Sequence, residues 1–526
     1  MTELTWRARA KKCQEMTAKS LNPAWLVALD KLPPAEQLDV MSFIETCGML
    51  TPAELEMTAT SGVDLVSQMG AGKLTAVEVV TAFLKRAHIG HQLLNLATEF
   101  LVDDALAKAA ELDEHFRGTG ELVGPLHGLP ISVKEHIGIK GRICHAGYTA
   151  WTDNVAGKDA LILRLLGAAG AVFHVRTNEP QSLMHLDCSN FIHGTTVNPY
   201  NRTLSPGGSS GGEGASLGYR CSVMGIGSDI GGSVRCPAAH CGAYGLRTTA
   251  LRNPCKGIFA AGPGQESIRC VVSPLANDTR DIDLLQRALL DQEPWEEETE
   301  LVPIPWKRVD PYKVIHPHPP ITRGLKYAVG KLKAAGVKVV DFEPYNHAEG
   351  WELIKTLYFP DAAKTQRDIL AETGEPIAPL TESAFKFARK EPITVTENWK
   401  LNIEREKYRA EYHRLMKDRG VDFILCPAYI GVAAELGSAR YFGYTSAWNI
   451  LDQPAIAFPT GLRQDPNVDA VEEGYKPRSP EDEEEYNMYS PEKFVGAPIS
   501  LQLVGKHFRD EETLAATDLV SKIIQA

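Results

Sequence analysis

Residues 206–215 have the sequence Pro-Gly-Gly-Ser-Ser-Gly-Gly-Glu-Gly-Ala, and residues 227–235 have the sequence Gly-Ser-Asp-Ile-Gly-Gly-Ser-Val-Arg. Each stretch places a serine, Ser209 or Ser233, in a loop rich in glycine. Glycine lets the backbone adopt positive φ and approach a ligand closely. A row of free backbone N–H groups in such a loop forms a concavity that binds anions. These two loops are therefore candidates for the walls of a reaction site.

A lysine lies upstream of both loops. Lys134 ends the segment His-Gly-Leu-Pro-Ile-Ser-Val-Lys at residues 127–134, which is a short run rich in β-forming residues. A serine, a lysine and an oxyanion-binding loop together outline an enzyme that transfers acyl groups through a covalent intermediate.

Four motifs resemble the amidase signature family. They are GPLHGLPISVKE, PGGSSGGEGA, GSDIGGSVR and GAPISLQLVGK, and the resemblance extends from about Thr60 to the C-terminus. The chain is most similar to fungal acetamidase-type enzymes, including the segments at 198–201 and 292–295. The resemblance implies an α/β fold with one large α/β/α domain over residues 61–526, in which helices flank a mixed central β-sheet. A helical extension is expected over residues 1–60.

The local sequence pattern predicts the same fold class. Short apolar runs predict strands at residues 130–133, 171–175, 336–340 and 423–427, and a helix is predicted over 159–169. Alternation of strands and helices is typical of an α/β fold. The apolar spacing between Val63 and Glu114 is helical, and Thr51 and Thr75 are predicted to cap helices.

Composition excludes several classes of protein. A length of 526 residues suggests roughly three domains by a soft prior, and the net charge of −12 argues against a nucleic-acid or anionic-membrane binder. Ten cysteines in a chain of this length do not form a disulfide framework. The N-terminus lacks a secretory apolar core, and no segment is apolar enough to span a membrane. We therefore expect a cytoplasmic protein without nucleic-acid or membrane partners and leave open a homodimer.

The resemblance implies a role for each residue of the catalytic triad. Ser233 is expected to be the nucleophile, Ser209 to relay the proton, and Lys134 to act as general base and then general acid. Family members hold the relay serine after a cis peptide bond, which here would join Gly208 to Ser209. Since a lysine has a reference pKa of about 10.4, Lys134 must be desolvated to accept a proton.

Further residues are expected to support these three. We expect the oxyanion hole to use backbone N–H groups of Ile230, Gly231, Gly232 and Ser233. Ser210 is predicted to donate or accept a supporting hydrogen bond, and Leu183 to face the acyl pocket beside Gln181 and Ser182. Asp229 and Arg235 are predicted to fix the loop by ion pairing. No metal or organic cofactor is expected, and the partner is a small-molecule amide.

Other chemistry-bearing residues have simpler interpretations. Cys236, His240 and Cys241 lie close in sequence, but their spacing is not that of a structural zinc site. Cys144 and His145 are sequence neighbours, whereas catalytic thiol–imidazole pairs are brought together by the fold. The aromatic segment at 441–448 could line a pocket or belong to the core. The acidic insertion at about residues 465–495 is interpreted as a solvated loop, with a lid over the site as the alternative.

Departures from the common family pattern bear on the substrate. Glu135 and His136 follow the lysine, where an aspartate is usual, and Ser228 replaces a frequent threonine. These changes favour a larger amide than acetamide, so the alternatives are a hydrolase or acyltransferase for a specialised-metabolite amide. The amidase subunit of a glutamine-dependent amidotransferase and a non-catalytic binding protein that keeps the fold are further alternatives.

Overall fold

The strand order of the central sheet explains how sequence-distant motifs meet. The computed structural model describes residues 6–306, 319–472, 475 and 480–526. Nine strands lie in the order β1-β3-β2-β6-β8-β7-β10-β11-β9. Their bounds are β1 Ala97–Phe100, β2 Pro130–Lys134, β3 Val172–Thr177, β6 Met224–Asp229, β7 Tyr244–Arg247, β8 Val271–Ala276, β9 Ile424–Pro427, β10 Ala455–Arg463 and β11 Pro498–Val504. β2 pairs in parallel with β3 and β6, and the other neighbours are antiparallel. The sheet is therefore mixed, as the sequence predicts.

The helices cover both faces of this sheet, and a two-stranded ribbon is formed by β4 (Ser189–Asn190) and β5 (Gly194–Thr195). The helices of the N-terminal half are α1 Trp6–Ser20, α2 Phe43–Thr46, α3 Pro52–Ala59, α4 Gly62–Gly70, α5 Ala76–Leu94, α6 Val102–Thr119, α7 Leu161–Ala168, α8 Gly211–Gly218, α9 Arg235–Cys241 and α10 Thr279–Leu290. Those of the C-terminal half are α11 Pro319–Ala334, α12 His347–Tyr358, α13 Lys364–Ala371, α14 Pro379–Phe385, α15 Val395–Asp418, α16 Gly443–Ile450, α17 Pro480–Asn487 and α18 Asp510–Gln525.

Side-chain alternation along β2 gives its two faces different partners. Ile131 and Val133 belong to a buried apolar cluster that also contains residues of α4, α5, α7 and α10. Ser132 and Lys134 point to the opposite face, where Ser132 Oγ hydrogen-bonds Glu213 Oε2 of α8 at 2.5 Å. Because successive residues of a strand point to opposite faces, this pattern buries an apolar layer on one side and gathers polar groups on the other.

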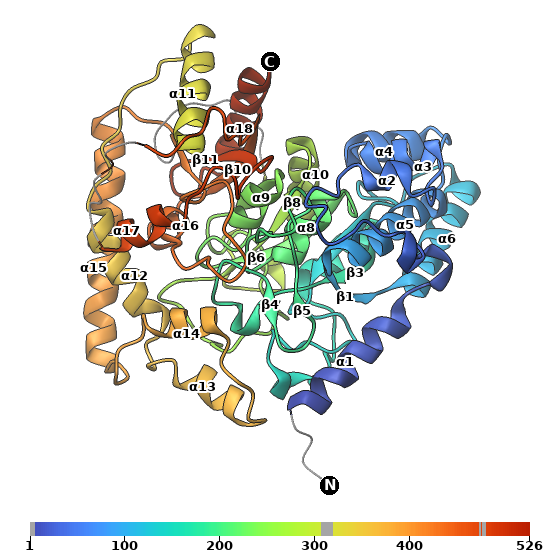
Figure 1. Cartoon of the computed structure of the whole chain (residues 1–526), viewed down its shortest axis with the longest axis horizontal. Coiled ribbons are helices and arrows are strands. Elements are labelled where there is room, and N and C mark those ends of the chain that lie inside the picture. Colours follow the sequence, from blue (N-terminus) through green and yellow to red (C-terminus); the bar gives the residue numbers. More distant parts are fainter. Residues whose placement is uncertain (1–5, 307–318, 473–474, 476–479) are drawn as a thin grey trace.

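The N-terminal segment packs against the β1 edge of the sheet. α1 runs beside β1, at the blue end of the chain in Figure 1. Val27, Val40, Ile44 and Leu50 join a buried cluster with side chains of α5, β1 and α8. The predicted caps at Thr51 and Thr75 are present as capping boxes, in which each side chain accepts from the backbone three residues on.

Most, but not all, of the local predictions agree with the structure. The strands predicted at 130–133, 171–175 and 423–427 are β2, β3 and β9. The strand predicted at 336–340 is wrong, since residues 336–340 belong to no strand. Val337 and Val339 pack against a core cluster while their neighbours are exposed. The alternation of buried and exposed residues thus results from packing on one side of the segment, although its backbone pairs with no strand. The segment from Val63 to Glu114, whose apolar spacing is helical, contains α4, α5 and most of α6, with β1 between the last two.

Residues 342–451 build a second layer that is rich in aromatic side chains. Rings from α12, α15 and α16 form one buried cluster, and these helices occupy the yellow and orange side of the molecule in Figure 1. The acidic insertion lies partly outside the described residues, at 473–474 and 476–479; its described part includes α17. Among the described residues, no helix combines the length and the apolar composition needed to cross a bilayer.

Candidate active site

Lys134 lies buried at the C-terminal end of β2, a central strand of the sheet. Its side chain has no exposure to solvent, and its Nζ donates to Ser209 Oγ at 2.6 Å and to Ser228 Oγ at 3.0 Å. Burial lowers the pKa of Lys134, although the nearby Glu179 carboxyl opposes that shift. Removing a charged amine from water favours its neutral form. The lysine therefore has the desolvated environment that a proton acceptor requires.

Ser209 lies in a bend that directly precedes α8. The peptide bond between Gly208 and Ser209 is cis, as the family resemblance implies. A Cβ atom at Gly208 would lie 2.1 Å from the backbone oxygen of Asp187, so that only glycine fits there. Ser210, the next residue, donates its backbone N–H to the carbonyl oxygen of Ser233 at 3.1 Å. This bond joins the two serine loops predicted from the sequence.

Ser228 and His136 extend the hydrogen-bond network of the lysine. His136 Nδ1 lies 2.9 Å from the carbonyl oxygen of Phe259, and its Nε2 lies 2.8 Å from Ser228 Oγ. A carbonyl oxygen only accepts, so Nδ1 carries the hydrogen and Nε2 accepts from the Ser228 hydroxyl. Burial, reinforced by the charge of Lys134, lowers the pKa of His136 to about 3. The Ser228 oxygen is thereby held as an acceptor for Lys134.

His136 and Ser228 depart from the common family pattern, and the sequence alone predicts no catalytic role for either residue. The signal available was their position, since His136 is two residues beyond the lysine and Ser228 lies on β6 beside β2. Both side chains line the same cavity as Ser209 and Ser233. They are therefore the site residues that the sequence prediction missed.

Ser233 lies in the loop between β6 and α9. The residue is 5% exposed and lines the cavity together with Ser209. Gly232 has a φ of 129°, and a Cβ there would lie 2.2 Å from Thr445 Oγ1. The backbone N–H of Gly232 donates to Asp229 Oδ1 at 2.9 Å. Of the four N–H groups predicted to converge on an oxyanion, that of Gly232 is consequently engaged, which leaves those of Ile230, Gly231 and Ser233 as candidates.

Asp229 and Arg235 form a buried ion pair at this loop. Arg235 Nη2 lies 3.1 Å from Asp229 Oδ1, and neither side chain is exposed. Asp229 also accepts from Val234 N at 3.1 Å and from Asn449 Nδ2 at 2.9 Å. Burial alone would raise the pKa of Asp229, but the charge of Arg235 and these hydrogen bonds hold it well below its usual range. Both residues thus fix the loop and do not line the cavity.

The cavity above these residues has a volume of about 890 Å³. Leu183 and Ser182 line it, whereas Gln181 is buried and donates to Glu375 Oε1 at 2.6 Å. The Ser182 hydroxyl is buried and has no hydrogen-bond partner among the described residues. The other lining side chains are mixed in character and include Met184, Leu251, Ile258, Arg269, Tyr358 and Asn402. The site can therefore hold an apolar group and still offer polar contacts.

The aromatic segment at 441–448 does not line this cavity in the described part of the chain. Phe442 and Trp448 are buried in the second-layer core. Tyr441 and Tyr444 line a different cavity, between α12 and α15. The described residues of the acidic insertion also lie away from the catalytic cavity, with Glu484 paired to Arg440 at 3.2 Å.

Possible metal ligands gather at one place in the described residues. Glu135, His145 and Glu179 bring one ligand atom each to within 4.8 Å of one another. Arg176 Nη2 lies 3.7 Å from Glu135 Oε1, so the positive charge next to this carboxylate is already supplied by an arginine.

Cys236 Sγ and His240 Nε2 are 3.6 Å apart, and burial raises the pKa of this thiol to about 12. Burial likewise raises the pKa of Cys144 to about 12, which disfavours a thiolate nucleophile.

The chain is similar to known amidases over nearly its whole length. The family model described as Amidase matches residues 78–514. An acetamidase from Emericella nidulans is 37% identical over 99% of this chain and 98% of its own length, and an acetamidase from Aspergillus oryzae is 34% identical over 100% of both. The solved structure of a fatty acid amide hydrolase matches with a TM-score of 0.96 at 38% identity, covering 99% of this chain and 95% of the other. The chain therefore belongs to the amidase signature family and is an amide-hydrolysing enzyme.

Proposed function

We propose that this enzyme hydrolyses carboxamides to a carboxylic acid and ammonia or an amine through an acyl-enzyme on Ser233. The observation that carries the proposal is the contact of 2.6 Å between buried Lys134 Nζ and Ser209 Oγ, at a cavity that Ser233 also lines. A hydroxyl is both donor and acceptor, so Ser209 can pass a proton between the other two residues.

The first half of the reaction forms the acyl-enzyme. Ser233 Oγ bonds to the amide carbonyl carbon while its proton passes to Ser209 and the Ser209 proton passes to neutral Lys134. The carbonyl oxygen becomes an oxyanion, which the N–H groups of Ile230, Gly231 and Ser233 stabilise. The protonated lysine then returns its proton through Ser209 to the nitrogen as the C–N bond breaks. Ammonia or an amine leaves, and an ester on Ser233 remains.

The second half repeats the same proton transfers with water. Water bonds to the ester carbon and gives its proton through Ser209 to Lys134. The C–O bond to Ser233 breaks, the proton returns to Ser233 Oγ, and the carboxylic acid leaves. The cycle uses one water molecule for each amide and restores all three side chains.

The size of the cavity supports a substrate larger than acetamide. A volume of about 890 Å³ falls in the range typical of pockets that enclose drug-sized ligands. The names of the two acetamidase relatives support a second candidate, the hydrolysis of short aliphatic amides. A measurement of substrate length separates the two candidates.

The test is the release of ammonia or amine from a series of straight-chain amides, with Ser233→Ala as the inactive control. For the larger substrate class, kcat/KM should rise about three- to fourfold for each added methylene until the cavity is filled, since each buried CH₂ contributes about 0.8 kcal/mol. A maximum at acetamide would select the second candidate. Unchanged turnover by Ser233→Ala would overturn the mechanism for both.

A further inference from the structure

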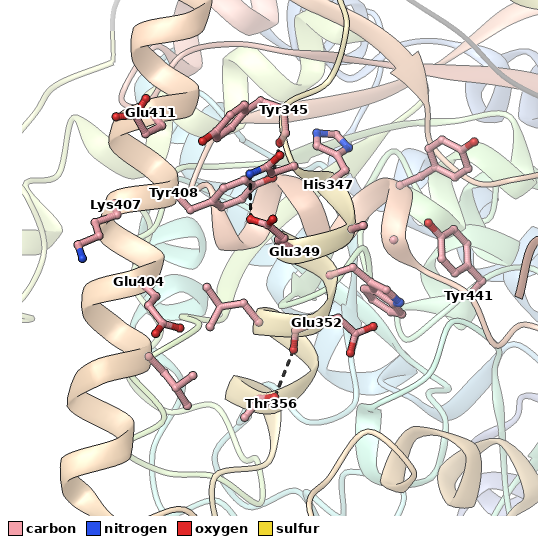
Figure 2. A pocket seen from close by; sticks show the side chains of 18 of the residues that line it. Tyr345, His347, Glu349, Glu352, Thr356, Glu404, Lys407, Tyr408, Glu411 and Tyr441 are labelled. Atoms are coloured by element: carbon pink, nitrogen blue, oxygen red, sulfur yellow. Dashed lines mark hydrogen bonds between the residues drawn. The ribbon is translucent and has the colours of Figure 1, made fainter. Parts of the chain in front are cut away.

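A second cavity, of about 1140 Å³, lies between helices α12 and α15 (Figure 2). Its other walls come from Ile430, from Tyr441, Gly443 and Tyr444 near the start of α16, and from Asp482 and Glu485 of α17. None of its lining residues lines the catalytic cavity. The two cavities share helices α12 and α15 but are lined by different residues of each, so this is a separate place in the fold.

Aromatic side chains form the walls of this cavity. The rings of Tyr345 and Tyr408 stack with centroids 6.3 Å apart, and the Tyr408 hydroxyl donates to the Tyr345 carbonyl at 3.2 Å. Gly350 permits their approach, because a Cβ there would lie 2.8 Å from the Tyr408 hydroxyl. Trp351 packs edge-on against Tyr441 at 5.5 Å. These contacts fix the rings before any ligand arrives.

The charge around the cavity is strongly negative. Six carboxylates line it, and they are Glu349, Glu352, Glu404, Glu411, Asp482 and Glu485. Lys407 is the one lysine or arginine among the described lining residues. His347 adds no charge at neutral pH, because burial lowers its pKa to about 4. Although Glu352 is paired with Lys355 and Glu411 with Arg414, Glu404 has no ion-pair partner in the described part of the chain.

Two properties of Trp351 indicate what kind of ligand suits these walls. Lys355 Nζ lies 5.2 Å from the ring centroid of Trp351, so this aromatic cluster already attracts one ammonium group. The indole N–H of Trp351 is buried and has no acceptor among the described residues. A buried donor without a partner is costly and gains from a ligand that accepts a hydrogen bond.

We propose that this cavity binds a small organic ammonium ion that also carries a hydrogen-bond acceptor. The apolar part of the ligand packs on Tyr345, Tyr408 and Trp351, and the cation faces the carboxylates of Glu349 and Glu404. Figure 2 shows Tyr408 and Glu404 extending from α15 toward the space that Glu349 enters from α12. Aromatic faces and carboxylates both attract a cation, and an aromatic wall also receives its alkyl groups.

The test compares choline with its neutral isostere 3,3-dimethylbutan-1-ol by isothermal titration calorimetry on the full chain. Both probes carry a hydroxyl, and only the charge differs. We expect choline to bind about tenfold more tightly, which combines a cation–π contact with a partly exposed ion pair. Equal affinity of the two probes, or no binding of choline, would overturn the proposal.

Charge variants on α15 test whether the cavity prefers a cation or an anion. Glu404→Gln should weaken choline binding about two- to fivefold, and Lys407→Gln should strengthen it by a similar factor. Glu391→Gln removes an exposed carboxylate outside the cavity and should change nothing. Tighter choline binding in Glu404→Gln together with weaker binding in Lys407→Gln would contradict the proposal and indicate an anionic ligand.

One aromatic variant tests which cavity is occupied. Trp399 lies on α15, as Glu404 and Lys407 do, but it is 64% exposed and lines the catalytic cavity. Trp399→Ala should leave choline binding unchanged, whereas Trp351→Phe, which keeps a ring but removes the N–H, should weaken it about threefold. Loss of binding in Trp399→Ala alone would place the ligand in the catalytic cavity and overturn the assignment.

Discussion

Replacement of Ser228 by alanine should move the pH dependence of catalysis in a defined direction. The Ser228 hydroxyl accepts from Lys134 Nζ at 3.0 Å and donates to His136 Nε2 at 2.8 Å. Ser228→Ala removes that acceptor from the lysine and leaves Ser209 in place. Because the ammonium form donates more strongly than the amine, the loss destabilises the protonated lysine more than the neutral lysine. The pKa of Lys134 should therefore fall.

The size of this shift follows from the hydrogen bond that is lost. A hydrogen bond to a charged group contributes about 1.5–3 kcal/mol and one between neutral groups about 1 kcal/mol. The difference between the two protonation states is then roughly 0.5–2 kcal/mol, and one pKa unit corresponds to about 1.4 kcal/mol. We expect the acidic limb of the pH profile to move about one unit toward lower pH.

The assay is kcat/KM for one amide from pH 5 to 10, because this ratio reports ionisations of the free enzyme. Ser222→Ala is a matched control, since the Ser222 hydroxyl is also buried and lies 3.3 Å from Nε2 of His174. The control should keep the wild-type limb. A Ser228→Ala limb that stays in place or moves to higher pH would refute the assignment of Lys134 as the titrating base.

Three further predictions concern the groups around the site. Asp229→Asn should destabilise the enzyme by about 3–5 kcal/mol in urea unfolding, since it leaves Arg235 buried and unpaired; a loss below about 1 kcal/mol would contradict this prediction. Burial raises the pKa of Glu213 to about 7 from 4.5, so the wild type should lose stability relative to Glu213→Gln as pH rises through that window, by roughly 3 kcal/mol. If the free energies of unfolding of the two proteins change equally from pH 4.5 to 7, this prediction is contradicted. Gly232→Ala should abolish amide hydrolysis, because its Cβ would collide with Thr445; wild-type turnover in a folded variant would show that the loop can shift.

That Lys134, Ser209 and Ser233 lie at one cavity could be predicted because three signals in the sequence agree. Glycine-rich loops, a β-forming run that ends in lysine and the spacing between them are all properties of the sequence itself. The structure brings Lys134 and Ser209 into contact across 75 residues of chain. The family resemblance supplied what local physics could not, namely the cis peptide at Gly208.

Other features depend on contacts that a single sequence does not reveal. The carboxylate of Asp229 accepts a hydrogen bond from the backbone N–H of Gly232. The sequence does not indicate which backbone N–H groups of the loop remain free to bind an oxyanion. The role of His136 depends on its contact with the Phe259 carbonyl, which is 123 positions away. Val337 and Val339 alternate with exposed residues, as in a strand, but their backbone finds no partner strand.

The cavity between α12 and α15 was also beyond sequence reasoning. Its walls combine residues near 350, 405, 441 and 482, and only Tyr441 and Tyr444 belong to a segment for which a pocket is one of two interpretations of the sequence. The acidic character of the insertion was visible, but its position against α12 and α15 is a consequence of tertiary packing.

The most direct test of the account is intact-protein mass spectrometry after reaction with a fluorophosphonate, followed by peptide mapping. We expect one adduct per chain on Ser233, no adduct in Ser233→Ala, and slower labelling in Lys134→Ala. Ser222→Ala should label like the wild type. An adduct on another residue, or labelling that persists in Ser233→Ala, would contradict the assignment of Ser233 as the nucleophile.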